Sequence, residues 1–374
     1  MPVYIGADNI ISPLGFTTEE NMEMLLQGKI GVKERIFPFS ESPFCCSVID
    51  ENVLKQQSHQ LKNYEQYTRL ETMCLLSIAD VVRQSQIDFS KKENLLIVST
   101  TKGNIDMLAN KYPNIDKNRV YLSVFAKKIG DYFSCVNTPL VVSNACISGI
   151  LAIIVAKRLI EEGTYKNIVV CGADLVTEFT LSGFKSFNAA SDKPSKPFDK
   201  NRTGINLGEA AASILLSSNK ISNVVIAGCS SANDANHISG PSRTGEGLFK
   251  AVSETLKESG VEDVHLISAH GTATEYNDEM EAIAFTRANL GHVPLNSLKG
   301  YYGHTLGAAG VLETIISLQS LKKNILIKSM GYELPGTSKE INVIKNTEEK
   351  TIKNFLKTAS GFGGCNAAII YSRN

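Results

Sequence analysis

The chain has 374 residues, of which 43% are hydrophobic and 20% are charged. These fractions are close to those of ordinary globular proteins, which excludes a disordered chain and allows a sizeable core. Lysine plus arginine and aspartate plus glutamate number 38 each, so no net field over the surface favours nucleic acid as a partner. The length is compatible with two or three ordinary domains or with one large α/β unit.

Cysteine usage and the apolar runs point to a reducing compartment. None of the eight cysteines makes a CxxC pair or a zinc-ligand spacing, and several lie in apolar runs, such as Cys171 after residues 168–170. Residues 1–6 lack the basic and long apolar regions of a signal peptide, and no apolar stretch reaches the roughly 18 residues of a membrane span. We therefore expect a cytoplasmic protein with no metal site and no membrane span.

Short apolar runs alternate with longer amphipathic stretches in chain order. Residues 95–98 predict a strand, residues 150–159 a helix and residues 167–172 another strand. This alternation is typical of a sheet covered by helices, so the expected fold class is α/β.

The second part of the chain repeats elements of the first. A helix that begins at Gly149 is echoed by one that begins at Gly310. A glycine-containing turn followed by an apolar run occurs at 204–216 and again at 361–371. Two such halves are what a duplicated fold leaves behind. We expect the boundary near the polar break at 218–220, and because no low-complexity linker marks it, the halves would share one core.

Cys146 lies between the apolar run 140–142 and the helical stretch 150–159. At such a strand-to-helix junction the sulfur is near unpaired helix amides, whose partial positive charge lowers the thiol pKa and favours the nucleophilic thiolate. Unpaired cysteines are also among the most buried residues, and many of them only pack. A covalent nucleophile and a structural cysteine are both compatible with this position.

His270 and His304 are each flanked by glycine, and each follows an apolar run. This pattern indicates a tight turn that lifts the imidazole out of the packed layer toward a cleft. Together with Cys146 they would form a Cys-His-His site, but two structural histidines explain the same residues equally well. Asp278 and Glu281 follow at helical spacing, and we expect them to cap or brace that helix rather than transfer protons.

Motifs that carry glycine, cysteine or histidine follow one another along the whole chain. They are residues 3–15, 145–149, 196–210, 234–238, 245–247, 268–274, 299–310 and 361–367. In this order they resemble, from end to end, the elongating β-ketoacyl-acyl carrier protein synthases of the thiolase superfamily, which have a Cys-His-His triad. The resemblance implies a thiolase-like fold, in which two duplicated βα halves pack in a layered αβαβα arrangement. Residues 1–220 would carry the nucleophilic cysteine and residues 221–374 both catalytic histidines.

The resemblance also implies which residues react. Cys146 would hold the acyl group, and His270 and His304 would act on the malonyl thioester. Lys299 and Glu313 match the supporting charged residues of the family.

A second set of positions would bind the substrate. The backbone amides of Cys146 and Phe362 match the family's oxyanion hole, and the Phe362 ring resembles its gate over the cysteine. Thr272 and Thr274 match the hydroxyls that meet the phosphopantetheine arm. Phe184 is the candidate for lining the acyl pocket.

The chain departs from the family's pattern at a few positions, none of them in the triad. They are Tyr301–Tyr302 in place of small polar residues, Cys365 in place of threonine, and Thr203 and Ile205 in place of an aspartate and an aromatic residue. The segment 103–146 also looks shorter than in fatty-acid relatives. Because that region shapes the dimer contact and the acyl tunnel in the family, the departures leave the substrate length open.

The expected activity is that of a β-ketoacyl-acyl carrier protein synthase, an acyltransferase that joins malonyl-acyl carrier protein to a cysteine-bound acyl group with loss of CO2 in fatty-acid elongation. The family binds no cofactor tightly, because the phosphopantetheine arm of the acyl carrier protein carries the substrate. One open alternative is a ketosynthase of an aryl polyene, pigment or polyketide pathway. Another is a thiolase, with Cys365 as the second reactive cysteine, although its place in the synthase pattern favours a structural role.

The implied partners are acyl carrier protein and a second subunit. An acidic carrier needs only a local basic patch, for which Lys62 with Arg69 or the pair Lys127–Lys128 are candidates, although such groups are more often plain solvated surface. The second subunit would be another copy of this chain or a cysteine-less synthase-like chain. Residues 107–135 are the expected contact.

Overall fold

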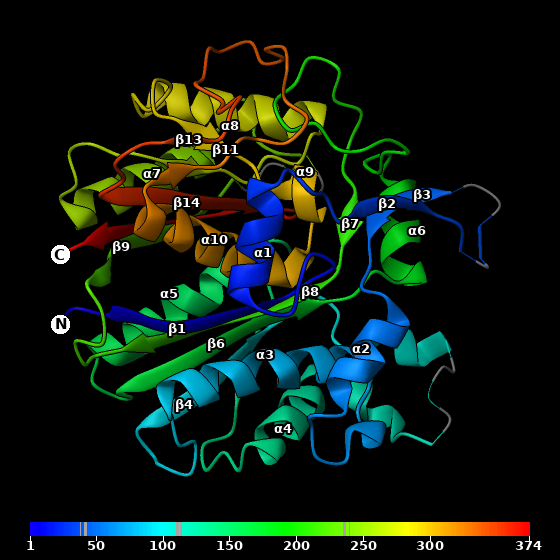
Figure 1. Ribbon diagram of the computed structural model, residues 1–374. Coiled ribbons are helices and arrows are strands. Elements are labelled where there is room, and N and C mark those ends of the chain that lie inside the picture. Colours follow the sequence, from blue (N-terminus) through cyan, green and yellow to red (C-terminus); the bar gives the residue numbers. More distant parts are fainter. Residues whose placement is uncertain (38, 41–42, 110–111, 113, 235–236, 239) are drawn as a thin grey trace.

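The largest sheet of the protein has ten strands, shown in Figure 1 for a computed structural model. The structure describes residues 1–374 except 38, 41–42, 110–111, 113, 235–236 and 239. From one edge to the other the strands are β11 (Leu295–Asn296), β10 (Ile267–Ser268), β14 (Asn354–Gly361), β15 (Cys365–Arg373), β9 (Val224–Asn233), β1 (Tyr4–Ile11), β8 (Ala210–Ser217), β6 (Asn167–Asp174), β4 (Asn94–Ser99) and β5 (Leu140–Val142).

These strands divide into two sets with the same order and direction. In chain order the first set is β1, β4, β5, β6 and β8, and the second is β9, β10, β11, β14 and β15. Numbered within its own set, each half of the sheet has the order 3-2-4-5-1. In both halves the fifth strand is antiparallel to its neighbours, whereas the other pairs are parallel. The duplication expected from the sequence is therefore present in the fold.

The two sets join at a short contact. Tyr4 of β1 pairs with Val225 of β9, and this pairing makes the sheet continuous. The division predicted at 220/221 falls between β8 and β9 and stays a prediction.

Helices cover both sides of each half of the sheet and give five layers (Figure 1). Helices α3 and α4 pack on the outer side of the first set, α7 and α8 pack on the outer side of the second, and α5 and α10 lie between the two sets. The bounds are α3 (Arg69–Ser85), α4 (Leu122–Tyr132), α5 (Ser148–Glu161), α7 (Glu246–Ser259), α8 (Glu275–Arg287) and α10 (Ala309–Lys323).

Smaller elements cover the ends of this core. The helices are α1 (Thr18–Leu26), α2 (Glu51–Ser58), α6 (Glu178–Ser186) and α9 (Lys299–Tyr302), with 3-10 turns at Tyr64–Gln66, Ile105–Ala109, Lys117–Val120 and Leu306–Ala308. The strands are β2 (Val32–Arg35), β3 (Phe44–Ser47), β7 (Leu207–Gly208), β12 (Ile325–Leu326) and β13 (Glu348–Glu349). Among the described residues, no helix is long and apolar enough to cross a membrane.

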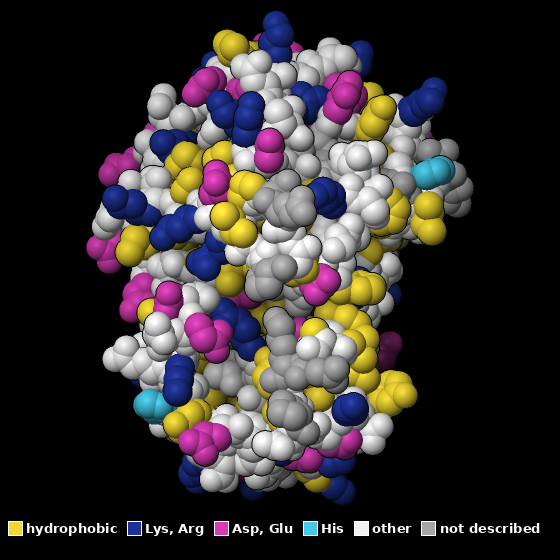
Figure 2. All heavy atoms as spheres, turned by 90° about the vertical axis from the view of Figure 1, so that its right-hand side faces the viewer, with side chains coloured by type: hydrophobic (Ala, Val, Ile, Leu, Met, Phe, Trp, Pro, Cys, Tyr) yellow, Lys and Arg dark blue, Asp and Glu magenta, His cyan; other side chains and the backbone are white. Residues whose placement is uncertain are grey.

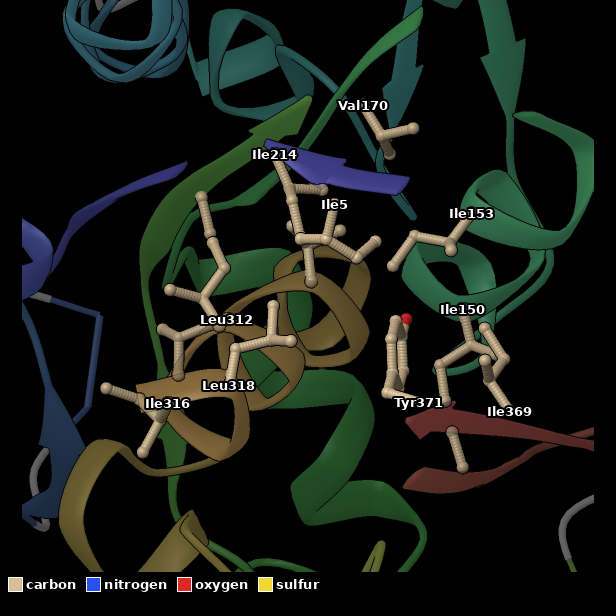
Figure 3. Close-up of a cluster of buried hydrophobic side chains, with 14 of the residues drawn as sticks. Ile5, Ile150, Ile153, Val170, Ile214, Leu312, Ile316, Leu318, Ile369 and Tyr371 are labelled. Atoms are coloured by element: carbon tan, nitrogen blue, oxygen red, sulfur yellow. The ribbon is translucent and has the colours of Figure 1, made fainter. Parts of the chain in front are cut away.

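The middle layer holds a large hydrophobic core, drawn in Figure 3. Both strand sets and both central helices contribute to it. The labelled residues are Ile5, Val170 and Ile214 from the first set, Ile150, Ile153, Leu312, Ile316 and Leu318 from the helices, and Ile369 and Tyr371 from the second set. Because one core serves both sets, the two halves pack as a single unit.

Two glycines let the central helices approach closely near their N-terminal ends. A Cβ built on Gly149 would lie 3.1 Å from the Cα of Gly310, and a Cβ on Gly310 would lie 2.5 Å from the backbone nitrogen of Ile150. At these distances a larger side chain would force the helices apart. These are the same glycines whose repetition marks the two halves in the sequence. Their contact brings the turns that carry Cys146 and His304 close together.

Charged side chains of both signs are interspersed on the face drawn in Figure 2, with no broad area of one sign. This agrees with the balanced composition of the chain. The face drawn there is thus not the basic face that nucleic acid requires.

Candidate active site

The structure brings together three residues that are far apart in the sequence. The Cys146 sulfur and nitrogen atoms of the His270 and His304 rings lie within 4.8 Å of one another. Cys146 stands between β5 and α5, His270 follows β10, and His304 follows α9. All three are buried, with exposed fractions of 7%, 2% and 1%.

The turn before α5 presents Cys146. Ala145 has a φ of 43°, in the left-handed region that non-glycine residues rarely adopt. The Ser148 hydroxyl fixes this turn, since it accepts the Asn144 N–H at 2.8 Å and donates to the Ala145 carbonyl at 2.6 Å. The strand-to-helix junction expected from the sequence is thus present. The hydroxyl of Ser148 holds its turn, in which Ala145 rather than a glycine takes the left-handed conformation.

The thiol of Cys146 is not activated by its position. Burial raises the pKa of Cys146 to about 12, and the neighbouring Cys365 also raises it. Lys299, Lys102 and the backbone amide of Phe362 favour the thiolate but do not compensate for the lost hydration. The pKa of Cys146 is therefore raised, not lowered as its position before the helix suggested, and burial is the largest cause.

Both histidines are neutral. Burial lowers the pKa of His270 and of His304 well below the usual value, and the ammonium group of Lys299 lowers both further. The rings are nearly perpendicular, with centroids 5.2 Å apart. Within the described part of the chain, His270 Nδ1 and both ring nitrogens of His304 have no hydrogen-bond partner. A neutral imidazole has one N–H donor and one acceptor, so these atoms can meet a ligand.

Glycines make the two histidine turns possible, as expected. Gly271 has a φ of 43° and Gly303 a φ of 67°. A Cβ on Gly271 would lie 2.5 Å from the Ser297 side chain, and a Cβ on Gly303 would lie 2.7 Å from the Leu207 carbonyl oxygen. Both positions therefore require glycine for its backbone freedom and for the close approach.

Two carboxylates of α8 hold the His270 turn. Glu281 accepts the backbone N–H groups of His270 at 2.8 Å and Gly271 at 2.6 Å, and Asp278 accepts that of Thr272 at 2.9 Å. The expectation that these residues brace their own helix is met in part, because Glu281 accepts from the Asn277 amide of α8 at 2.9 Å while both carboxylates also hold the preceding turn. Burial, and then the nearby Asp278, raises the pKa of Glu281 to about 7.

Behind the histidines lies a buried cluster of opposite charges. Lys299 Nζ lies 2.8 Å from Glu313 Oε1 and donates to the His270 carbonyl at 2.5 Å. Lys357 Nζ lies 2.7 Å from the other carboxylate oxygen of Glu313. Burial alone would raise the pKa of Glu313, but the two ammonium groups bring it below its usual value.

Sequence reasoning paired Lys299 with Glu313 but missed Lys357. The available signal was a lysine inside β14, directly after the apolar pair Phe355–Leu356. A second missed residue is Asp174, which accepts the Gly307 N–H at 2.7 Å and the Thr101 N–H at 2.8 Å. Asp174 thereby ties the turn after His304 to the turn after β4.

A cavity of about 650 Å³ opens onto the three central residues. Among its lining residues are Phe184, Thr272, Thr274 and Phe362, as the resemblance implies. The two threonine hydroxyls are 2.8 Å apart. The wall therefore combines neighbouring hydroxyls with aromatic rings.

Aromatic rings surround Phe362 at this cavity. The Phe184 ring stacks on it with centroids 5.6 Å apart, and the Phe187 ring meets it edge-on at 5.3 Å. Phe184 also lies edge-on to His304 at 6.5 Å. Phe187, which the sequence interpretation did not single out, is 53% exposed and marks the outer end of this group.

The departures from the family's pattern fall in different places. Thr203 and Ile205 line the cavity, whereas Tyr301–Tyr302 are fully buried and are not among its lining residues. Cys365 lies beside the nucleophile, because a Cβ on Gly361 would be 2.9 Å from its sulfur and 3.1 Å from the Cys146 nitrogen. Residues 235–236 of the motif 234–238 lie outside the described residues.

The candidate basic patches differ in their availability. Arg69 forms ion pairs with Glu209 and Glu51, so its charge is already neutralised inside the protein and is not available to a carrier. Lys127 pairs with Asp131 on the surface at 2.8 Å. Such exposed pairs are weak and exchange readily.

One cysteine sulfur and two histidine nitrogens within 4.8 Å of one another are also a donor set that binds zinc in proteins. Neutral imidazoles suit that role as well as hydrogen bonding to a substrate. The donor set alone thus fits a metal as well as a covalent catalyst.

Comparison with known families decides between these types of site. Residues 92–220 match the family model of the beta-ketoacyl synthase N-terminal domain, and residues 224–333 match that of the C-terminal domain. The chain belongs to the beta-ketoacyl synthase family. It is therefore an acyltransferase-type enzyme, as the sequence motifs predicted.

Individual relatives come from both fatty-acid and polyketide synthesis. The chain is 27% identical to a putative mitochondrial 3-oxoacyl-[acyl-carrier-protein] synthase of Schizosaccharomyces pombe over 99% of both chains. It is 33% identical to 3-oxoacyl-[acyl-carrier-protein] synthase 2 of Rhizobium meliloti over 62% of this chain and 60% of that one. It is also 31% identical to the ketoacyl synthase alpha subunit of the tetracenomycin polyketide synthase of Streptomyces glaucescens, over 62% of this chain and 59% of the relative.

Solved ketosynthases have the same fold over the whole chain. One is a ketosynthase from Xenorhabdus doucetiae in complex with its chain length factor, with a TM-score of 0.86, 23% identity and coverage of 100% and 98%. Another is a beta-ketoacyl synthase from Burkholderia phymatum, with a TM-score of 0.87, 21% identity and coverage of 100% and 99%. The predicted thiolase-like fold is confirmed.

Proposed function

We propose that this ketoacyl synthase extends an acyl group held on Cys146 by decarboxylative condensation with malonyl-acyl carrier protein, in fatty-acid elongation. The observation that carries the proposal is the approach of Cys146, His270 and His304 to within 4.8 Å at a single cavity. A nucleophile and two free imidazoles are the groups that this chemistry requires.

In the first step Cys146 takes the acyl group from its carrier. The sulfur attacks the thioester carbonyl, the new S–C bond forms, and the carrier thiol leaves with the proton. Because the Cys146 thiol is neutral, its proton has to depart during the attack, and a neutral imidazole accepts it. The backbone amides of Cys146 and Phe362 stabilise the oxyanion of the tetrahedral intermediate.

In the second step the malonyl group loses CO2. The electrons of the broken C–C bond move to the thioester oxygen, and His270 and His304 donate N–H hydrogen bonds to that enolate. Each well-placed donor in such a site contributes about 3 to 4 kcal/mol to the transition state. The carbanion then attacks the acyl carbonyl on Cys146, a C–C bond forms, and the C–S bond breaks. The sulfur leaves as the thiolate and takes one proton from solvent, which balances the charge left by loss of CO2.

The phosphopantetheine arm of the carrier enters through the cavity. The Thr272 and Thr274 hydroxyls on its wall hydrogen-bond to the amide groups of the arm. Phe362 turns aside to admit the substrate, and Phe184 lines the path of the acyl chain. The carrier delivers the arm from outside, so no cofactor needs to stay bound.

The working unit is a dimer in a reducing compartment such as the cytoplasm. β5 is the last strand of the sheet, and its Leu140 is 40% exposed, so this edge can accept another chain. In the predicted contact region 107–135, Leu108 and Tyr121 are 67% and 63% exposed. Residues 110–111 and 113 of this region lie outside the described part. The partner is a second copy or, as in the Xenorhabdus doucetiae complex, a chain length factor.

A polyketide pathway is the second candidate. The 31% identity to the tetracenomycin alpha subunit favours it, as does the group of Phe184, Phe187 and Phe362, whose flat faces suit a conjugated acyl chain. Competing saturated and polyunsaturated acyl carriers against each other separates the pathways. A preference for the saturated primer supports fatty-acid elongation, and a preference for the conjugated primer supports the polyketide pathway.

The covalent step is tested by intact mass after incubation with an acyl-carrier thioester. The wild type and Cys365→Ser should gain one acyl group, and Cys146→Ala should gain none. An adduct that persists in Cys146→Ala and maps to Cys365 would favour a thiolase-like enzyme instead.

A further inference from the structure

Lys357 is a buried cation that the steps above do not use. Its side chain is fully buried in β14. The ammonium group donates to the carbonyls of Thr358 at 2.8 Å and Ser268 at 3.1 Å, and more weakly to that of Ala269 at 3.5 Å. An unpaired charge in this position would be strongly unfavourable, so a specific environment has to hold it.

That environment is a set of oxygen atoms that suits a cation. Besides the carbonyls, Lys357 meets Glu313 at 2.7 Å, and the Glu281 carboxylate also favours its charged form. Burial lowers the pKa of Lys357, and Glu313 opposes that shift. The carboxylate of Glu313 is thus clamped between the ammonium groups of Lys357 and Lys299.

The contacts of Lys357 lead directly to His270. Ser268 and Ala269 precede it in the chain, and both carbonyls accept from Lys357. The next carbonyl, that of His270, accepts from Lys299. Three successive carbonyls are therefore held by two ammonium groups, and they fix the backbone from which the His270 ring projects.

We propose that Lys357 is a positioning residue for the malonyl half-reaction: a built-in cation that holds the strand before His270 and keeps Glu313 ionised. The inference rests on the proposed function for its kinetic test. Loss of a lysine that only stabilised β14 would lower both half-reactions alike. Loss of a lysine that positions His270 should spare acylation, because Cys146 lies on the other strand set.

The electrostatic consequence gives a test that needs no catalysis. Around His270 lie Lys299, Lys357 and His304, which all lower its pKa, together with the Cys146 thiol and the Glu281 carboxylate. The Glu313 carboxylate lies behind them, paired with the two lysines. Removing the charge of Lys357 removes one cation that disfavours the imidazolium, so the pKa of His270 rises. The acid limb of malonyl decarboxylation then moves to higher pH.

The experiment compares Lys357→Met, which removes the charge, with Lys353→Met, an exposed lysine near the start of the same strand. We expect decarboxylation in Lys357→Met to fall about tenfold to a hundredfold, as small misplacements in active sites do. Acylation of Cys146 should stay close to wild type, and Lys353→Met should change neither reaction. Equal loss of both half-reactions, or loss of neither, would overturn the proposal.

A second variant, Lys357→Ala, tests the same role by chemical rescue if Lys357→Met does not fold. Lys357→Ala leaves space in the oxygen-lined site, so methylammonium chloride should restore its decarboxylation, whereas tetramethylammonium chloride at the same ionic strength should not. Equal rescue by both salts, or by neither, would contradict a site-bound cation.

A titration of the His270 ring by NMR separates this proposal from the proposed function. If the wild type does not decarboxylate malonyl-acyl carrier protein, the proposed function fails, yet the pKa of His270 should still be higher in Lys357→Met than in the wild type. An unchanged His270 pKa would overturn the role of Lys357 whatever the activity.

Discussion

The two sides of the cavity hold their reactive groups in different ways. Cys146, on the side of the first strand set, rests on a strained turn fixed by the hydroxyl of Ser148, and burial keeps its thiol neutral. His270, on the side of the second set, is surrounded by formal charges, with Glu281 at its amide and Lys299 at its carbonyl. The two halves of a duplicated fold thus support a buried, neutral nucleophile on one side and a donor pair fixed by charged groups on the other.

The difference corresponds to the two half-reactions. Acyl exchange between sulfurs is nearly balanced and needs little beyond a nucleophile, an acceptor for its proton and an oxyanion site. Formation of a carbanion develops charge on the substrate, and preorganised donors stabilise that charge most effectively when they cannot reorient. Substitutions on the cysteine side and on the histidine side should therefore affect the two half-reactions differently.

The largest effect is expected for loss of the nucleophile. Cys146→Ala should lower condensation of acyl and malonyl carriers by about 10⁴-fold or more, as removal of a covalent nucleophile does in other acyl-transfer enzymes. Product formation is measured by mass spectrometry of the carrier. Cys365→Ser is the matched control and should retain condensation; retention in Cys146→Ala would refute the assignment.

The pH dependence of the free thiol should reveal its raised pKa. Since the thiolate is the reactive form and the Cys146 pKa is about 12, alkylation by iodoacetamide should rise about tenfold per pH unit from 7 to 10 without a plateau. The rate is followed on the peptide that contains Cys146. A plateau near pH 7 would instead show an activated thiolate, as the position of Cys146 before the helix first suggested.

The contact between the two central helices should be sensitive to a single methyl group. Gly310→Ala puts a Cβ 2.5 Å from the Ile150 nitrogen and should lower the free energy of unfolding by about 1 to 3 kcal/mol, measured by denaturant titration. Gly183→Ala in α6 meets no atom within 4 Å and should raise it by about 0.5 to 1 kcal/mol. Equal effects of the two variants would mean that the helices do not depend on this contact.

The smallest expected effect is that of a chelator. Condensation after dialysis against EDTA should equal that of untreated protein, because both proposed half-reactions use protein groups alone. Metal analysis of the purified protein accompanies the assay. Stoichiometric zinc together with loss of activity on chelation would assign Cys146, His270 and His304 to a metal site.

Much of this arrangement could be predicted from the sequence. Gly149 and Gly310 signal close approaches, and the glycines beside the histidines signal left-handed turns, in which glycine is strongly favoured. The motif order identifies the family, and with it the fold. Burial of Tyr301–Tyr302 in the core, away from the cavity, could not be predicted, because their distance from the substrate depends on the packing of α9.

The charge network was harder to predict for a physical reason. Lys357 meets Glu313 and the carbonyl of Ser268 only because β14 pairs with β10 in one particular register. The direction of the Cys146 pKa was also missed, since the helix amides are visible in the sequence whereas the extent of desolvation is not. Local motifs report turns and residue types, but they do not report burial.

The histidine side of the cavity carries malonyl decarboxylation without the help of Cys146, and CO2 release from malonyl-acyl carrier protein without an acyl acceptor measures that half-reaction alone. Cys146→Ala should still release CO2, whereas adding His270→Ala or His304→Ala to that variant should lower the release by about a hundredfold or more. His292→Ala, at an exposed histidine, is the control and should have no effect. Unimpaired CO2 release in both histidine variants would contradict the account.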